Sequence, residues 1–371
     1  MAARHPPLWI RELLAPVALG EHELLRVLGS GRLGLGRIVK QRFKRWVAVL
    51  VVVVVASGIA LNVLAYRHAY AMTHFTAGKP RTQEPEKLTI GQKVKVLLRG
   101  VNIPRPQTRA SPTDLGPATK SLRLDGTNGI TLGAWYCPGP SQSPLVILFH
   151  GYTGEKSGTL PEARAFLELG LSVLLVDFRG SGDSSESYTT IGYDEAEDVA
   201  AAVRYAHAHL PHGKVILYGQ SMGAAAILRA VHSCGVRPDA IIVEAVFDRM
   251  LKTVRHRFEA MGVPSFPGAE LLVFWGGRQA GFDGFSHNPI QYAASVECPI
   301  LFLHGAADPR AHIEEARRVF AAVHAPKRFR EFPAIGHEAS VVRYPGEWRE
   351  AVSQFLGDED VAANGRLSLV H

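Results

Sequence analysis

One serine in the sequence has neighbours that suit it for covalent chemistry. Ser221 lies between Gly219 and Gly223 in the stretch LYGQSMGAAAI, after the apolar run KVILY and before a series of small helix-forming residues. A serine on a tight strand-to-helix turn projects its hydroxyl group, and side chains at the two glycine positions would collide with the adjacent backbone. The pattern G-x-S-x-G also arises by chance in glycine-rich chains, so the strand-turn-helix setting is what favours a nucleophile over an ordinary turn serine.

A serine hydroxyl needs a base and an orienting acid, which this setting places later in the chain in the order serine, acid, histidine. Asp308 follows the apolar run PILFLHG, and His337 follows the expected strand KRFREF. His337 is the predicted base, with a plain loop histidine as the alternative. Asp308 is the predicted acid, and Asp248 is its competitor because the end of the preceding strand, DAIIVEAV, can also supply the carboxylate.

Two earlier loops are expected to shape the same site. In LFHGYTGEKSG, the backbone amide of Tyr152 is the predicted partner of the Met222 amide in an oxyanion hole, although the tyrosine ring could instead be only a pocket wall. His150 precedes the nucleophile, so we expect it to shape a turn. Asp177 and Asp183, in VDFRGSGDS, are expected to brace loops.

These residues require a sheet that brings several loops to one edge. Short apolar runs (PLVILF, SVLLVD, KVILYG, DAIIVEAV and PILFLHG) alternate with stretches typical of helices at 161–169, 193–209, 221–232, 313–323 and 345–356. Strands that are apolar on both faces belong to a parallel sheet covered by helices. The stretch SLRLDGTNGITLGAWYC indicates an antiparallel hairpin. The predicted fold is α/β, a doubly wound and mostly parallel sheet opened by this hairpin and preceded by one transmembrane helix.

The charge distribution points to a membrane rather than to nucleic acid. Residues 1–45 contain nine Lys or Arg against three acids, whereas the rest of the chain has 32 basic and 31 acidic residues. Residues 46–66 (WVAVLVVVVVASGIALNVLAY) contain no charge and are long enough to cross a bilayer as a helix. Basic residues gather before this segment, so we expect a single-pass signal anchor with a cytoplasmic N-terminus and the bulk of the chain outside the cytoplasm. A buried core helix and a cleaved signal peptide are the alternatives.

The chain therefore divides by sequence into five parts. We expect a basic cytoplasmic segment at 1–45, the anchor at 46–66, a stalk with an edge strand at 67–118, the catalytic domain at 119–358 and a tail at 359–371. The segment GSGRLG, residues 29–34, formally matches a dinucleotide-binding pattern, but no strand precedes it, so we expect a flexible basic segment there.

A small lid is expected within the domain at 249–297. Its apolar side chains could line an acyl site or face the bilayer, or could simply pack helices against the sheet; they are Phe258, Met261, Phe266, Leu271, Leu272, Phe274, Trp275 and Phe282.

The cysteines indicate no metal site and no disulfide framework. Cys137, Cys234 and Cys298 are odd in number and widely spaced. Buried thiols are the expectation, although one pair could close outside the cytoplasm.

Taken in order, FHGYTG, DFRGSGDS, YGQSMG, LHGAADPR and GHE resemble the α/β-hydrolase superfamily. More narrowly, the chain resembles its serine-aminopeptidase-like branch with a small lid, which includes membrane-anchored esterases and acyl-thioesterases. The resemblance covers roughly residues 122–356. It implies a triad of Ser221, Asp308 and His337, an oxyanion hole at Tyr152 and Met222, and neither metal nor organic cofactor.

The expected activity is hydrolysis of a carboxylic ester or a lipid-like or thioester acyl substrate through an acyl-enzyme on Ser221. A serine peptidase would share the triad, and a non-catalytic binding protein could share the fold. No nucleic-acid partner is expected.

Overall fold

The computed structural model of the chain describes residues 21–78, 80–83 and 87–357. It contains two compact units, one ending at Leu61 and the other beginning at Asn62. The expected tail at 359–371 and the first twenty residues of the basic segment lie outside the described residues.

Within the described residues, the first unit consists of helix α2 (Glu21–Thr73) as far as Leu61. The part of α2 from Lys40 to Thr73 is long and apolar enough to cross a membrane. The segment GSGRLG lies within α2, so the expectation of a flexible segment there is wrong. Glycine lowers helix stability by only about 1 kcal/mol per residue, and the leucines and arginines around these glycines favour a helix.

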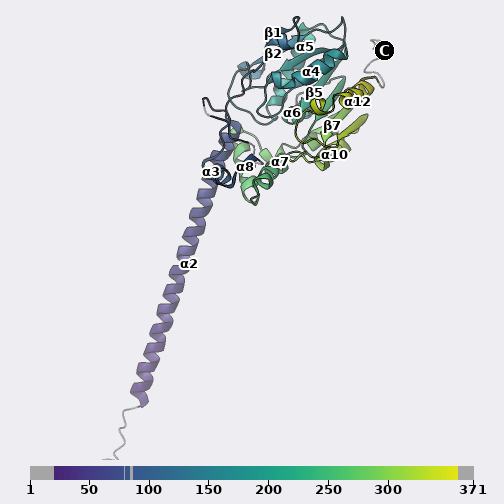
Figure 1. Cartoon of the computed structure of the whole chain (residues 1–371). Helices are drawn as coiled ribbons and strands as arrows, with labels where there is room; N and C mark the ends of the chain where they lie inside the picture. Colours follow the sequence, from purple (N-terminus) through teal and green to yellow (C-terminus); the bar gives the residue numbers. More distant parts are fainter. Residues whose placement is uncertain (1–20, 79, 84–86, 358–371) are drawn as a thin grey trace, which may run out of the picture. The chain divides into compact units, whose positions relative to one another are not determined.

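The second unit is built on one sheet of eight strands in the order β1-β2-β4-β3-β5-β6-β7-β8 (Figure 1). Strand β1 pairs antiparallel with β2, and β2 pairs antiparallel with β4, whereas all later pairs are parallel. The predicted hairpin and the predicted mostly parallel sheet are therefore confirmed. The strands are β1 (Lys120–Asp125), β2 (Thr131–Cys137), β3 (Leu145–Phe149), β4 (Ser172–Val176), β5 (Val215–Gln220), β6 (Ala240–Glu244), β7 (Ile300–Gly305) and β8 (Lys327–Phe332).

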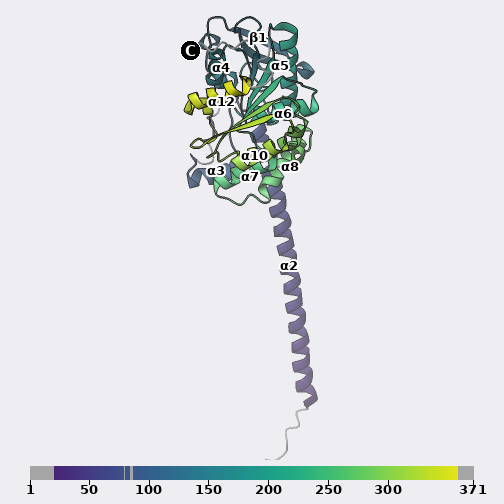
Figure 2. The ribbon, with the colours of Figure 1, turned by 90° about the vertical axis from the view of Figure 1, so that its right-hand side faces the viewer.

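Helices cover both faces of this sheet (Figure 2). One face packs against α5 (Glu195–His209), α6 (Met222–Ser233), α9 (Pro289–Tyr292) and α10 (Ile313–Ala322). The other face packs against α4 (Leu160–Glu168), α11 (Ser340–Arg343) and α12 (Pro345–Gly357). Central strands such as β3 are fully buried because both faces are covered, which is why they read as unbroken apolar runs.

The segment expected to be a stalk with an edge strand instead contains helix α3 (Ile90–Arg99), so the edge-strand prediction is wrong. A capping box starts the helix: the Gln92 backbone N–H donates to the Thr89 hydroxyl, and the Thr89 N–H donates to the Gln92 side-chain oxygen at 2.9 Å. Exposed apolar side chains then recur at Ile90, Val94 and Leu98, which is a helical rather than a strand spacing. This helix belongs to the same compact unit as the sheet.

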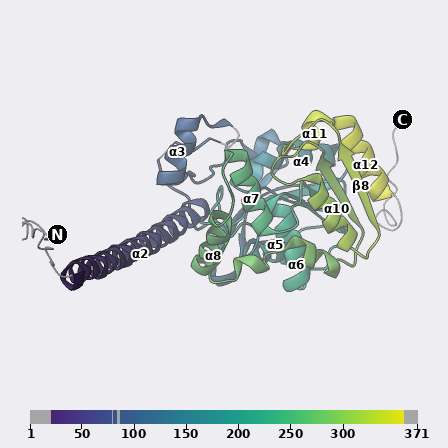
Figure 3. The ribbon, with the colours of Figure 1, turned by 90° about the horizontal axis from the view of Figure 1, so that it is seen from below.

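The segment predicted to be a lid, residues 249–297, consists mainly of α7 (Met250–Met261) and α8 (Gly268–Ala280), which group with α3 at one end of the unit (Figure 3). Its apolar side chains divide between the roles expected for them. Met261 lines the cavity that also contains Ser221 and His337, whereas Phe258 and Leu272 pack against a small core that includes side chains of α7 and α8. Phe282 stacks on Tyr193, and Phe266 is 76% exposed.

The three cysteines are free thiols in this structure. Cys137 is buried, and Cys234 and Cys298 are partly buried.

Two carboxyl groups are buried beside one tyrosine in the core. The Tyr218 hydroxyl on β5 lies 2.5 Å from a Glu244 carboxylate oxygen and 3.4 Å from one of Glu162 on α4. The hydroxyl has one proton and can donate to only one of them, so a protonated Glu162 would complete the group by donating to the tyrosine oxygen. Burial, assisted by the charge of Glu244, raises the pKa of Glu162 from 4.5 to about 8.

This raised pKa predicts a pH-dependent stability. A carboxyl that binds its proton more tightly in the folded state favours folding below its unfolded pKa, and that contribution is lost as the pH rises through about 8. We expect Glu162→Gln to raise Tm above pH 8 and to change it little below about pH 4.5. A gain of 1 kcal/mol corresponds to about 2–4 °C for a domain of this size.

Thermal unfolding followed across this pH range would measure the effect. Glu168→Gln, at the exposed end of the same helix, is the control; it removes only a surface ion pair with Arg349, which contributes little to stability. A Tm difference between wild type and Glu162→Gln that is the same at every pH would contradict the protonated state assigned to this carboxyl.

Candidate active site

Ser221 occupies a strained turn between β5 and α6. Its backbone has φ 52° and ψ −108°, outside the favoured regions for a residue with a side chain. The turn is held by a hydrogen bond of 2.8 Å from the Ser221 N–H to the carbonyl oxygen of Glu244. A Cβ at Gly219 would lie 2.5 Å from the Gly223 carbonyl carbon, and one at Gly223 would lie 2.4 Å from the Phe149 carbonyl oxygen. Both glycines are therefore required by close backbone approach.

His337 joins Ser221 to Asp308. Its Nε2 lies 3.0 Å from the Ser221 hydroxyl oxygen, and its Nδ1 lies 2.6 Å from Asp308 Oδ2. The loop after β8 and the loop after β7 thus bring two residues, far from Ser221 in sequence, within hydrogen-bonding distance. With Nδ1 donating to the carboxylate, Nε2 is free to accept the serine proton.

The Asp308 carboxylate is fixed by its own loop. Its Oδ1 accepts hydrogen bonds from the backbone N–H groups of Arg310 at 2.8 Å and Ala311 at 3.0 Å. Burial acts to raise the pKa of Asp308, but the hydrogen bond and charge of His337, together with the two backbone amides, outweigh it and lower the pKa. The group therefore stays ionised at neutral pH.

Asp248, the competing acid, has other partners. Its Oδ2 accepts from Arg318 Nε at 2.8 Å and from Lys252 Nζ at 3.1 Å, and the side chain is fully buried. Asp248 therefore lies in an ion-pair group between the lid helix α7 and α10.

Glu244 connects the two halves of this arrangement. Its backbone carbonyl receives the Ser221 N–H, and its side-chain Oε1 accepts from the Ser340 N–H at 2.6 Å and the Ser340 hydroxyl at 2.7 Å. Ser340 lies three residues after His337, so one buried residue at the end of β6 holds both the serine turn and the histidine loop. Sequence reasoning did not single out Glu244; its only signal was an acid inside an apolar strand.

Tyr152 and Met222 both line the cavity that contains Ser221 and His337. Among the described residues, neither backbone N–H donates to another protein group. The Tyr152 hydroxyl has a separate partner, donating to the Met72 carbonyl oxygen at 2.5 Å. Both amides thus remain available to a ligand.

The loops around Tyr152 are braced as expected. His150 Nδ1 lies 2.8 Å from the Gly151 carbonyl oxygen, and its Nε2 accepts from the Phe178 N–H at 3.1 Å. Asp177 accepts from the Lys156 backbone N–H and from Lys156 Nζ at 2.6 Å, with both side chains fully buried. Lys156, which the sequence gave no reason to expect inside, therefore ties the loop that follows β3 to the loop that follows β4.

A cavity of about 360 Å³ opens onto Ser221 and His337. The α7 helix supplies part of its wall, and a second part comes from the described residues between 81 and 103, which sequence reasoning had assigned to a stalk. The lining of the whole cavity is mainly apolar, with side chains that include Leu88, Val96, Val101, Ile103, Phe247 and Met261.

The comparisons with known proteins concern the fold that carries this site. The family described as "alpha/beta hydrolase fold" matches residues 144–234. An uncharacterized protein of Mycobacterium tuberculosis is 28% identical over 68% of this chain and 84% of its own length, and YqkD, an uncharacterized protein of Bacillus subtilis, is 27% identical over 60% and 74%. The solved esterase Pf2001 of Pyrococcus furiosus has a TM-score of 0.59 and 24% identity, covering 69% of this chain and 97% of that one, a likeness that concerns the fold.

The chain has the α/β-hydrolase fold. The resemblance drawn from the five motifs is thereby confirmed, and the eight-stranded sheet is the sheet of an α/β hydrolase.

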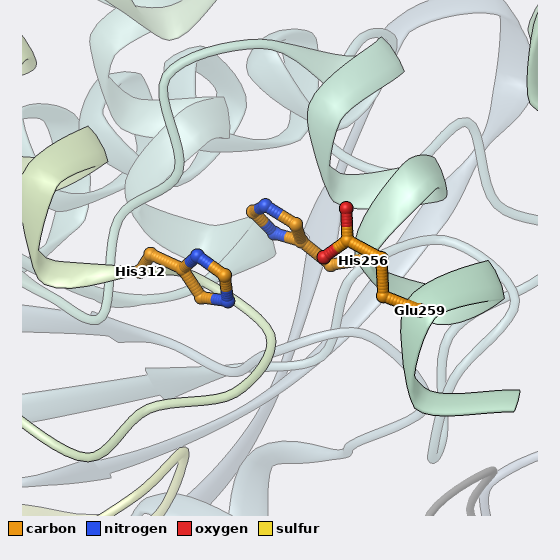
Figure 4. A group of neighbouring side chains, drawn as sticks. All are labelled: His256, Glu259 and His312. Atoms are coloured by element: carbon orange, nitrogen blue, oxygen red, sulfur yellow. The ribbon is translucent and has the colours of Figure 1, made fainter. Parts of the chain in front are cut away.

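Near the cavity of this α/β hydrolase, three side chains have the chemistry of metal ligands. His256 and Glu259 on α7 and His312 at the start of α10 bring ligand atoms within 4.8 Å of one another (Figure 4). However, His256 Nδ1 lies 3.1 Å from the Arg310 carbonyl oxygen, and the two imidazoles stack with centroids 3.9 Å apart. Stacked rings do not converge on one point as zinc ligands do, so the arrangement of the two imidazoles does not favour a zinc site.

The close approach at Gly223 predicts a large destabilisation of the hydrolase by one methyl group. In Gly223→Ala the new Cβ would meet backbone oxygen atoms of Phe149 and His150, which cannot rotate away. We expect a loss of about 1–3 kcal/mol or more in the free energy of unfolding. Urea unfolding would measure it.

Gly346→Ala in α12 is the control, because its Cβ would meet nothing within 4 Å and alanine favours a helix. Equal unfolding midpoints for Gly223→Ala and wild type would show that β3 and α6 are less tightly packed than described.

Proposed function

We propose that this α/β hydrolase is a membrane-anchored serine hydrolase that cleaves carboxylic esters or other acyl substrates, lipid-like or thioester, through an acyl-enzyme on Ser221. The observation that carries the proposal is the continuous hydrogen-bonded chain from Asp308 through His337 to Ser221, with distances of 2.6 and 3.0 Å.

The reaction follows from the chemistry of these groups. His337 Nε2 takes the proton of the Ser221 hydroxyl as Oγ attacks the acyl carbon, and the carbonyl oxygen becomes an oxyanion. The amides of Tyr152 and Met222 would donate to that oxyanion. His337 then gives its proton to the departing alcohol or thiol. Water, deprotonated by the same nitrogen, attacks the acyl-enzyme and releases the acid and the free serine.

Asp308 would orient the imidazole and stabilise its charged form. Its carboxylate is held by two backbone amides, and its lowered pKa keeps it ionised. Asp248 is the less favoured acid because its Oδ2 is bound by Arg318 and Lys252, whereas the His337 imidazole hydrogen-bonds to Asp308.

The mainly apolar cavity supports an acyl substrate, and the apolar part of α2 supports a membrane anchor. An aminopeptidase would need an anion for the substrate amine. Glu155, the one carboxylate among the described lining residues, accepts hydrogen bonds from the N–H and hydroxyl of Ser157. Ester cleavage is therefore preferred to peptide cleavage.

Fluorophosphonate labelling tests the nucleophile and base together. We expect labelling of wild type, none of Ser221→Ala and a strong loss in His337→Ala, because the probe reacts with an activated serine. Asp308→Asn should lower kcat by on the order of 10⁴, whereas Asp248→Asn should retain most activity, provided thermal melts show both variants to be folded. Persistent labelling of Ser221→Ala would remove the proposal, and a wild type that never labels would favour a non-catalytic binding protein.

Topology can be tested with reporters fused to the C-terminus of the full chain. The positive charges of Lys40, Arg42, Lys44 and Arg45 before the apolar stretch lead us to expect active alkaline phosphatase and dark green fluorescent protein in a Gram-negative host. The opposite pair of signals would place the catalytic domain in the cytoplasm.

A further inference from the structure

The wall of the cavity carries a positive charge that the proposed hydrolysis does not use. Three arginines, Arg81, Arg257 and Arg310, line the cavity, and Glu155 is the one acid among its described lining residues. Because Arg310 takes part in other interactions, the charge available to a ligand comes from Arg81 and Arg257.

The partners of these two arginines are uncharged. Arg81 Nη2 donates to the Thr153 hydroxyl at 2.7 Å, and the Arg257 guanidinium lies 5.2 Å from the centre of the Tyr152 ring. Among the described residues, neither arginine forms an ion pair with a carboxylate. Arg81 is exposed and Arg257 is partly buried, and a hydroxyl or an aromatic face engages only part of a guanidinium, so most of its N–H donors can exchange water for an anionic ligand.

The two guanidiniums approach the loop that would hold the oxyanion. They come from different parts of the unit, Arg81 from the segment before α3 and Arg257 from the lid helix α7, and they contact the consecutive residues Thr153 and Tyr152. Burial raises the pKa of the Tyr152 hydroxyl, and the charges of Arg257 and Arg81 act to lower it, which agrees with both groups lying near that ring.

Positive charge in the wall of a substrate cavity favours substrates that carry a negative charge. A half-buried arginine such as Arg257 is only partly screened by water, so its attraction for an anion is stronger than at an open surface. The planar fork of a guanidinium matches the oxygen atoms of carboxylates and phosphates. The remaining wall is mainly apolar, so a purely polar anion would leave most of the cavity unused.

We propose that the cavity binds amphipathic acyl esters that carry one anionic group, a carboxylate or a phosphate, and that Arg257 and Arg81 bind this group while the apolar chain lies against residues such as Val96 and Met261. This inference rests on the proposed function for the identity of the reaction, and it adds the charge of the substrate. Arg257 and Arg81 are thus specificity residues and take no part in proton transfer.

The first test compares esters that differ in one charge. With the full chain in a neutral detergent, we expect the mono-para-nitrophenyl ester of suberic acid to be cleaved with a kcat/KM about tenfold above that of para-nitrophenyl octanoate, whose chain has the same length. Arg257→Gln and Arg81→Gln should reduce this ratio several-fold through KM, Arg257→Lys should reduce it less, and salt should lower it in wild type. Arg204→Gln, on the exposed side of α5, is the control.

A second pair distinguishes the anion and its position. Lysophosphatidic acid carries a phosphate on the alcohol side of its ester, and the monoacylglycerol with the same acyl chain carries none. If the protein prefers lysophosphatidic acid and the preference depends on the arginines, the bound anion is a phosphate on the leaving group. If it prefers the suberate ester in the same way, the bound anion is a carboxylate on the acyl group. Either result supports the proposal. If neither preference changes in Arg257→Gln or Arg81→Gln, or if wild type prefers the neutral ester in both pairs, the proposal is overturned.

Binding separates this proposal from the proposed reaction. Calorimetric titration of Ser221→Ala with octanoate, octyl phosphate and octanol requires no catalysis. Tighter binding of either anion than of octanol, lost in the Ser221→Ala variant that also carries Arg257→Gln, supports the anion site even if hydrolysis fails. Equal binding of all three ligands removes the anion site and leaves the serine chemistry untouched.

Discussion

The close approach of β5, α6 and the end of β3 is the constraint on which the site depends. At Gly219 and Gly223 the backbones come so near that a methyl group would overlap main-chain atoms. This contact forces Ser221 into a positive φ at the top of the sheet, and a conformation of this kind costs on the order of 1–3 kcal/mol. The fully buried strands on either side of the turn stabilise the domain enough to hold it.

The same region explains how distant loops keep their places. Glu244 ends the neighbouring strand, receives the Ser221 N–H on its carbonyl and holds Ser340 with its carboxylate. The proposed nucleophile and the loop of the proposed base thus share one rigid support, and an error of even 1 Å in their separation would be costly for catalysis. Lys156 and Asp177 form a fully buried ion pair that fixes the loop carrying Tyr152 in the same way.

Segments outside the sheet determine what can reach the serine. The described residues between 81 and 103 and the helix α7 wall the cavity, and both bring arginines to the loop at Tyr152. In the proposed function, the loops at the edge of the sheet carry the reacting groups, and these two added segments determine which substrates bind. Fold and specificity therefore reside in different parts of the chain, as in other α/β folds whose chemistry depends on loops.

The sequence by itself determined the sheet, most of its helices and the Ser221 turn, because those features follow from local patterns: apolar runs, helix signals and a glycine two positions before and after a serine. It also narrowed the other site residues to a few aspartates and histidines. Only the tertiary structure placed Asp308 beside His337 while Arg318 engaged Asp248, and only it turned a presumed stalk into a cavity wall containing α3. These contacts form between residues that are far apart in the chain, and several partners compete for each charged group. A local sequence pattern therefore cannot predict which partner each group contacts.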